Sequence, residues 1–245
     1  MLVREQLAER EVSVFLPPSY QTTDRHFPVV YVQDGGQVVQ GCFNLLQHMA
    51  ITGEIVEIIY VGLHTTRRNL EYTPWASYAV SMDRENFGGG GDAYLKEIIE
   101  VVKPQIDSKY RTLSQAEHTG IAGYSLGGLI SLYALYRHAD VFTRYAILSP
   151  SLWFTGFLQF MDNQVPLAPQ DRNRIYIHVG EREGIYKQNV QKEMLTNNRQ
   201  AYRILQKQGY SEECLKFVVD SQGTHDAVFF MQYFTKAMQW LFRTS

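Results

Sequence analysis

The residues that could do chemistry begin with a serine among glycines. Residues 123–128 read Gly-Tyr-Ser-Leu-Gly-Gly and match the pattern Gly-x-Ser-x-Gly. In that pattern the serine stands on a sharp turn between a strand and a helix, where its hydroxyl is exposed as a nucleophile. Residues 118–122 are strand-like, and residues 129–136 have the length and apolar density of a buried helix. We therefore predict that Ser125 is the nucleophile of an acyl transfer; the alternative is a glycine-rich turn with an incidental serine.

A nucleophilic serine needs a histidine base, and three of the seven histidines follow it in the chain. His138 stands near the end of the helix after the turn, roughly 20 Å from the serine along the helix axis. His178 lies within a strand, where a core histidine is expected. His225 stands in Gly-Thr-His-Asp, between the last strand and the last helix. Because a loop at a strand end lets an imidazole reach the serine, we predict His225 as the base.

A carboxylate that orients the base is expected after the preceding strand. Residues 180–184 read Gly-Glu-Arg-Glu-Gly and directly follow a strand-like run. We predict Glu183 as this acid and keep Glu181 as the alternative, while a solvated loop carboxylate is the non-catalytic reading. Two further carboxylates near the base in sequence belong to Asp220 and Asp226.

Stabilising the oxyanion of the reaction requires two backbone N–H groups. One is expected from Leu126, immediately after the nucleophile. The other is expected from the glycine pair after an early strand, with Gly36 preferred and Gly35 as the alternative; an ordinary glycine turn is the non-catalytic reading. This chemistry needs neither a metal nor an organic cofactor, so we predict none.

Composition limits the class of protein. The chain has 245 residues, 45% of them hydrophobic, and a net charge of −2, so no basic surface for nucleic acid is indicated. Cys42 and Cys214 lie far apart and suggest neither a metal site nor a disulfide framework.

The sequence shows no targeting or membrane segment. Residues 1–10 are charged and lack the apolar segment of a secretory signal, and no run approaches the roughly 20 apolar residues that span a bilayer. A soluble cytoplasmic protein with no membrane partner is predicted; its oligomeric state is left open.

Strand-like and helix-like segments alternate along the chain, which predicts an α/β fold with a mostly parallel sheet and helices on both faces, in one domain spanning residues 1–245. The expected strands are residues 11–16, 27–32, 55–63, 118–122, 141–148, 174–179 and 214–219.

Three helices besides the one after Ser125 are expected, and residues 64–91 are expected to form a long loop without clear periodicity. The first helix should be capped by Asp92 and end near Pro104. The second should cover residues 188–208 and stop at Gly209, and the last should cover residues 227–242.

With these residues in place, the chain resembles the esterase D-type family of α/β-hydrolases, and within it the enterobactin and bacillibactin esterase branch that hydrolyses siderophore trilactones. Several short motifs carry the resemblance in the family's order. Besides the serine motif and the glycine run at 88–91, they are residues 12–20 (Val-Ser-Val-Phe-Leu-Pro-Pro-Ser-Tyr), 31–35 (Tyr-Val-Gln-Asp-Gly), 68–74 (Arg-Asn-Leu-Glu-Tyr-Thr-Pro), 149–153 (Ser-Pro-Ser-Leu-Trp) and 223–225 (Gly-Thr-His).

The resemblance implies a small-molecule ester substrate, and specifically a ferric catecholate siderophore whose hydrolysis releases iron. It gives Trp153 a role as an aromatic wall for an acyl group, with a core tryptophan as the structural alternative. The family often has a second tryptophan where this chain has Phe154. It also implies that Arg67 and Arg68 contact substrate oxygens through charge-assisted hydrogen bonds. The alternative without a substrate role is a surface arginine or an internal ion pair between Arg68 and Glu71. The third triad member varies in the family, and some members resemble serine–histidine dyads.

Other functions remain open at this stage. A general short-acyl or aryl esterase or thioesterase, an acyltransferase with an alcohol acceptor, and a non-catalytic binding module on a hydrolase-like fold would share the same elements.

Overall fold

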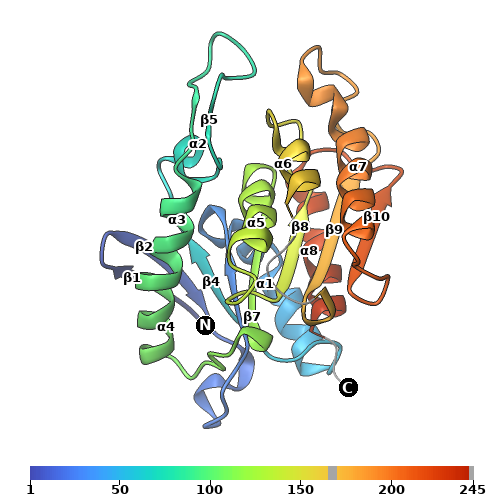
Figure 1. Ribbon diagram of the computed structural model, residues 1–245. Coiled ribbons are helices and arrows are strands. Elements are labelled where there is room, and N and C mark those ends of the chain that lie inside the picture. The colour runs from blue at the N-terminus through green and yellow to red at the C-terminus, as the bar shows by residue number, and fades with distance from the viewer. Residues whose placement is uncertain (165–169, 243–245) are drawn as a thin grey trace.

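A sheet of eight strands forms the centre of the computed structural model, which describes residues 1–164 and 170–242 (Figure 1). The strand order is β1-β2-β4-β3-β7-β8-β9-β10. The first two pairs are antiparallel and the pairs from β4 to β10 are parallel. The strands are β1 Leu2–Leu7, β2 Arg10–Phe15, β3 Val29–Val32, β4 Ile59–Leu63, β7 Thr119–Tyr124, β8 Arg144–Leu148, β9 Arg174–Gly180 and β10 Leu215–Asp220.

Helices cover both faces of this sheet. Helices α1 and α8 bury their apolar residues against one face, and α3 to α7 pack on the other (Figure 1). The helices are α1 Gln37–Ile51, α2 Arg68–Glu71, α3 Gly91–Glu97, α4 Lys103–Lys109, α5 Leu126–Arg137, α6 Phe157–Asn163, α7 Met194–Lys207 and α8 Ala227–Leu241. The α/β fold predicted from the alternation of segments is confirmed.

The central strands are apolar on both sides because both sheet faces are covered. On β3, Tyr31 points to the face with α3 to α7, while Val30 and Val32 point to α1 and α8. On β7, Ile121 and Ala122 divide in the same way. Since parallel strands all end at one edge, the loops after β3, β7, β8, β9 and β10 meet there, which is where ligands bind in open α/β sheets.

Each of the seven segments expected to be extended overlaps a strand. The elements β1, α1 and α6 were not anticipated, and neither were those within residues 64–91 that are described below. Residues 2–7 form the edge strand β1, which pairs with β2 along its whole length. Arg4 is exposed, whereas the half-buried Glu5 carboxylate accepts hydrogen bonds from Lys109 Nζ and Tyr110 Oη, and the charges of this segment gave no strand signal. Helix α1 lies directly after the glycine pair and was likewise not predicted.

Two expectations for the helix after the glycine run were wrong. Helix α3 begins at Gly91, so Asp92 does not cap it; the Asp92 carboxylate instead accepts hydrogen bonds from Tyr133 Oη and Arg137 Nε on α5. The helix also does not end at Pro104. It continues through a π-helical turn at Ile98–Val102 into α4, in which Pro104 is the second residue.

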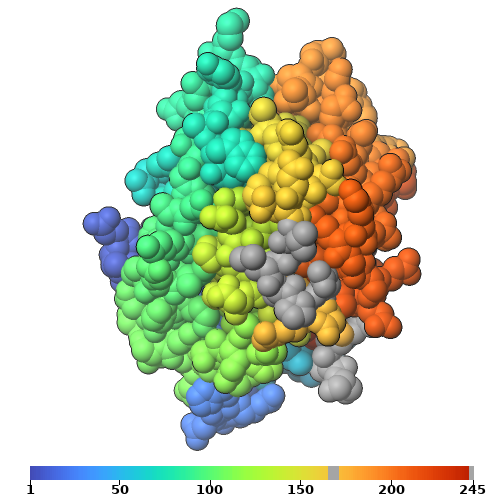
Figure 2. Space-filling model, in the orientation of Figure 1, coloured from blue at the N-terminus to red at the C-terminus, as the bar shows by residue number. Residues whose placement is uncertain are grey.

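The segment 64–91 is more ordered than the plain loop that was expected. It contains α2 and a two-stranded hairpin of β5 (Ala76–Ser77) and β6 (Phe87–Gly88). Trp75, just before this hairpin, packs against Phe154, Phe157 and Phe160, so the segment lies against α6, as the teal and yellow surfaces in Figure 2 also show.

At the C-terminal side, the predicted helix 188–208 is shorter than expected. A 3₁₀ turn at Val190–Glu193 precedes α7, and Gly209 then ends the helix with a φ of 99°. Within residues 1–164 and 170–242, no helix has both the length and the apolar character needed to cross a bilayer.

Candidate active site

Ser125 lies on the turn between β7 and α5, in a strained conformation with φ 57° and ψ −124°. The turn is tight because Gly123 lies against Gly127: a Cβ at Gly123 would be 2.3 Å from the Gly127 carbonyl oxygen. Glycine is therefore required by the close approach of strand and helix. The N–H of Leu126 belongs to the first turn of α5, where no intrahelical acceptor exists, and so it is available to an oxyanion.

Glu183 and His225 form a close pair. Glu183 Oε2 lies 2.6 Å from His225 Nδ1, and the acid is only 3% exposed. Its other oxygen, Oε1, accepts hydrogen bonds from Gly180 N at 2.7 Å and Ser149 Oγ at 2.5 Å. These donors stabilise a buried carboxylate, which then holds His225 with Nδ1 as donor and leaves Nε2 free to accept a proton. This assignment of the tautomer follows from the partner of Nδ1.

A phenylalanine that sequence reasoning missed joins His225 to the serine turn. Phe230 on α8 meets the His225 ring edge-on at 5.0 Å between ring centroids and stacks on Tyr124 at 4.7 Å. Tyr124 directly precedes Ser125, so Phe230 contacts both His225 and the residue before the serine. Nothing in the sequence distinguished Phe230 from a core residue of α8.

The loops that carry the acid and the base touch through two glycines. A Cβ at Gly180 would lie 2.4 Å from the Gly223 carbonyl oxygen, which itself accepts a hydrogen bond from Arg182 N at 3.0 Å. Larger residues would separate the two loops. The alternative acid, Glu181, is exposed on the same loop.

The segment Ser149-Pro150-Ser151 after β8 contacts two members of the proposed triad. Ser149, with a φ of 43°, donates to Glu183 as described, and Ser151 Oγ lies 3.2 Å from Ser125 Oγ. Both Ser149 and Ser151 are buried. Within the described residues Ser125 makes this side-chain hydrogen bond and none to His225. Hydrogen bonds between a nucleophile and its base are often absent or long without substrate and tighten when it binds. The sequence indicated these serines only as part of a family motif.

The glycine pair after β3 lies in a single 3₁₀ turn, Asp34–Gly36, at the same edge of the sheet. Gly36 N–H donates to the Gln33 carbonyl at 3.2 Å. This long bond must yield if Gly36 is to serve an oxyanion, and the choice between Gly36 and Gly35 stays a prediction.

Arg68 reaches this turn and does not pair with Glu71, so the internal pair considered above was wrong. Arg68 Nε binds Asp34 Oδ1 at 2.7 Å, whereas the preceding residue, Arg67, binds Glu71 at 3.0 Å. The first helical turn of α2 rotates the two arginines to different sides. Burial tends to lower the pKa of Arg68, but the Asp34 carboxylate outweighs it and the pKa is raised. With a third of its side chain exposed, Arg68 can still meet a ligand beside the serine turn.

Trp153 is half-buried on the rim of the core and contacts Phe87 of β6, with ring centroids 6.0 Å apart. Its neighbour Phe154 is buried and packs edge-on against the same ring at 5.4 Å. Trp153 therefore packs on the core and on the β5–β6 hairpin, and its role as an aromatic wall for a substrate stays a prediction.

Within the described residues, the other two histidines after Ser125 make no side-chain hydrogen bond to Ser125 or Glu183. His178 is buried in β9 and stacks on Tyr233 at 3.6 Å, and burial lowers its pKa to about 4. His138 follows the last turn of α5, with its N–H bonded to the Ala134 carbonyl. Across residues 1–164 and 170–242, no cluster of three His, Cys, Asp or Glu side chains could hold a metal ion.

Comparison with known proteins places this arrangement in a family. The model of the family described as "Putative esterase" matches residues 7–241. The chain belongs to this esterase family. It is accordingly a carboxylic ester hydrolase with the α/β fold of that family.

Similar proteins extend this result. "Uncharacterized protein YbbA" of Bacillus subtilis is 30% identical over 98% of this chain and 96% of its own length. The "Siderophore enterobactin esterase" of Emericella nidulans is 30% identical over 39% of this chain and 33% of its own. The crystal structure of an IroE-like serine hydrolase from Shewanella oneidensis superposes with a TM-score of 0.84 at 23% identity, covering 99% of this chain and 80% of that one, which shows a common fold.

Proposed function

We propose that the esterase cleaves its substrate through an acyl-enzyme on Ser125, with His225 as base and Glu183 as the acid that orients it. The observation that carries this proposal is the 2.6 Å contact between Glu183 and His225 beside the strained serine turn. Burying a carboxylate costs free energy, and three hydrogen-bond donors, one of them the imidazole, offset that cost here. Such a buried pair is typical of a site that has to hold an imidazole and stabilise its charged form.

The reaction follows from these positions. His225 Nε2 takes the proton of Ser125 Oγ as the oxygen bonds to the ester carbonyl carbon. The negative charge that develops on the carbonyl oxygen is stabilised by hydrogen bonds from the Leu126 N–H and from a glycine N–H of the Asp34–Gly36 turn. His225 then protonates the departing alcohol, and water, deprotonated by the same imidazole, releases the acid and restores the serine.

Ser125→Ala tests the nucleophile. Hydrolysis of p-nitrophenyl butyrate and labelling by a fluorophosphonate probe should both disappear, while the circular dichroism spectrum and Tm stay close to those of the unaltered protein. A folded wild-type protein that refuses the probe would favour the non-catalytic binding module. Activity retained by Ser125→Ala would place the nucleophile elsewhere.

For the substrate, we propose a catecholate siderophore trilactone. The support is the partial match to an enterobactin esterase, the half-buried ring of Trp153, and the guanidinium of Arg68 beside the serine turn. Aromatic rings stack on catechols, and arginine donates to their oxygens. These features also suit a general aryl or short-acyl esterase, which is the second candidate.

The two candidates differ in kcat/KM. We expect a ferric catecholate trilactone to exceed p-nitrophenyl acetate and butyrate by at least about a hundredfold, roughly 3 kcal/mol of transition-state binding. Trp153→Ala and Arg68→Ala should reduce this preference, whereas Arg67→Ala is the matched control because Arg67 is exposed and binds Glu71 instead. Rapid cleavage of the small esters with no cleavage of the trilactone would identify a general esterase.

A further inference from the structure

The turn after β3 has an unusual backbone. Asp34, Gly35 and Gly36 have successive positive φ values of 55°, 65° and 72°. Glycine adopts this region freely, but for aspartate the left-handed conformation costs about 1 kcal/mol. Something outside the turn must therefore hold Asp34, and the proposed oxyanion donors Gly35 and Gly36 directly follow it.

Asp34 is held at both its backbone and its side chain by the end of α2. The Asp34 N–H donates to Tyr72 Oη at 2.8 Å, and the Asp34 carboxylate binds Arg68. The Arg68 guanidinium also lies 5.3 Å from the centre of the Tyr72 ring. One short segment, residues 68–72, thus supplies both contacts.

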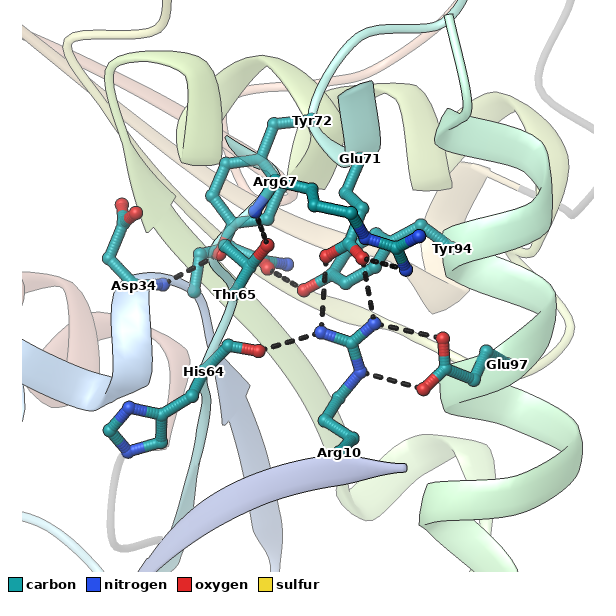
Figure 3. Close-up of polar contacts among 10 residues, drawn as sticks. Arg10, Asp34, His64, Thr65, Arg67, Glu71, Tyr72, Tyr94 and Glu97 are labelled. Carbon is teal, nitrogen blue, oxygen red and sulfur yellow. Dashed lines mark hydrogen bonds and ion pairs between the residues drawn. The ribbon is translucent and has the colours of Figure 1, made fainter. Parts of the chain in front are cut away.

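Tyr72 is itself rigidly placed. Its side chain is fully buried, and its ring lies 5.3 Å from that of Tyr94. The Tyr94 hydroxyl donates to Gln33 Oε1, so the residue just before the turn is also tied to this aromatic pair. Figure 3 shows these rings between the turn and the polar cluster described next.

An ionic cluster fixes the helix that carries Tyr72. Arg10 on β2 binds the buried carboxylate of Glu71 with both terminal nitrogens and also binds Glu97 on α3 (Figure 3). A further Arg10 bond reaches the His64 carbonyl at 2.7 Å. Multidentate pairs of this kind define orientation better than single contacts do. Since Glu71 adjoins Tyr72 in the chain, the cluster anchors the tyrosine relative to the sheet.

The opposite side of the turn leaves it no room to move. A Cβ on Gly35 would lie 2.6 Å from the His64 ring, and the Gly35 carbonyl oxygen would lie 2.2 Å from a Cβ on Gly62. The His64 ring is held in turn by Ser13 Oγ at 2.8 Å. The turn is therefore packed between His64 and β4 on one side and the Tyr72 hydroxyl on the other.

From this geometry we infer that Tyr72 is a positioning residue for the oxyanion hole: its hydroxyl oxygen holds the Asp34 amide and so sets the direction of the following glycine N–H. The inference rests on the acyl-enzyme proposed above. It assigns Tyr72 no contact with the substrate, so its effect must fall on transition-state stabilisation and leave ground-state binding unchanged.

The test is Tyr72→Phe, with Tyr145→Phe as the matched control. Tyr145 is equally buried and loses a comparable hydrogen bond, 2.6 Å to the Phe142 carbonyl, away from the turn. With p-nitrophenyl butyrate, Tyr72→Phe should lower kcat by about 10–100-fold with KM within about twofold. It should also weaken inhibition by an aryl boronic acid, whose adduct mimics the tetrahedral intermediate, by a similar factor. Tyr145→Phe should lower Tm without changing either quantity.

Each result decides the inference. Unchanged kcat in folded Tyr72→Phe, or an equal loss in Tyr145→Phe, overturns it. If Tyr72→Phe does not fold, fluorotyrosines incorporated at position 72 keep the ring and weaken the acceptor oxygen. In that series kcat must fall with each added fluorine, and a flat series overturns the inference. A wild-type protein without esterase activity or probe labelling would instead contradict the proposed function itself.

Discussion

Glu183 Oε2 lies 2.6 Å from His225 Nδ1, across 42 residues of sequence. The acid has no exposed side-chain surface, whereas the imidazole is 39% exposed. This difference suits the proposed roles, since a buried acid stays fixed while the base must reach both the serine and the substrate. It also separates Glu183 from Glu181, its exposed neighbour on the same loop.

Glu183→Gln should lower kcat on p-nitrophenyl butyrate by about 10²–10⁴-fold, because an amide can place its N–H against Nδ1 and favour the wrong tautomer of His225. Glu181→Gln is the control and should remain within about threefold of wild type. Steady-state kinetics of the two variants check this. A loss under about tenfold for Glu183→Gln would indicate a serine–histidine dyad, and a severe loss for Glu181→Gln would reverse the choice of acid.

Ser149→Ala removes the hydroxyl that donates to Glu183 Oε1 at 2.5 Å. Oε1 of the buried carboxylate then keeps only the Gly180 N–H as donor, so we expect the free energy of unfolding to fall by about 1–3 kcal/mol and kcat by about 5–30-fold. Thr143→Val is the control, since Thr143 Oγ1 donates to the Ala116 carbonyl at 2.6 Å near the start of β8. It should lose stability with kcat unchanged. Urea unfolding and kinetics on both variants separate the effects; equal kcat losses would argue against a role for Ser149 in holding the acid.

His178 should make stability depend on pH. Burial lowers its pKa from 6.5 to about 4, a shift that Glu183 and Asp220 oppose and Lys236 reinforces. Between these values the unfolded chain binds a proton that the folded chain excludes, so the free energy of unfolding falls as pH drops from 6.5 to 4. The expected loss is about 2 kcal/mol between about pH 7 and pH 5.

His178→Phe preserves the stacking on Tyr233 and removes this titration. The unfolding free energy of wild type minus that of His178→Phe should therefore fall between about pH 7 and pH 5. Urea unfolding of both proteins at both pH values measures it. His26→Gln, at an exposed position, is the control and should leave the pH dependence unchanged. If this difference is the same at both pH values, folding does not lower the pKa of His178.

Local sequence determined the elements that short-range sterics control. The serine turn was predictable because Gly123 and Gly127 are needed wherever strand and helix approach this closely. The central strands were predictable because a sheet covered on both faces requires unbroken apolar runs. The order Ser125, Glu183, His225 followed from placing each side chain in a loop after a parallel strand.

Tertiary structure decided which polar groups meet. Spacing along the chain favoured Glu71 as the partner of Arg68, yet Arg68 binds Asp34, 34 residues earlier in the chain. The contacts of Ser149 with Glu183 and of Tyr72 with Asp34 likewise join residues 34 and 38 positions apart.

Hydrogen bonds at such separations depend on strand order and on the rotation of each helix about its axis. Neither is encoded in local spacing: Arg67 and Arg68 are neighbours in the chain, yet they bind Glu71 and Asp34 respectively. The turn that carries Ser125 was therefore predictable from the sequence, whereas the side chains that hold Glu183 and the Asp34–Gly36 turn were decided by packing in three dimensions.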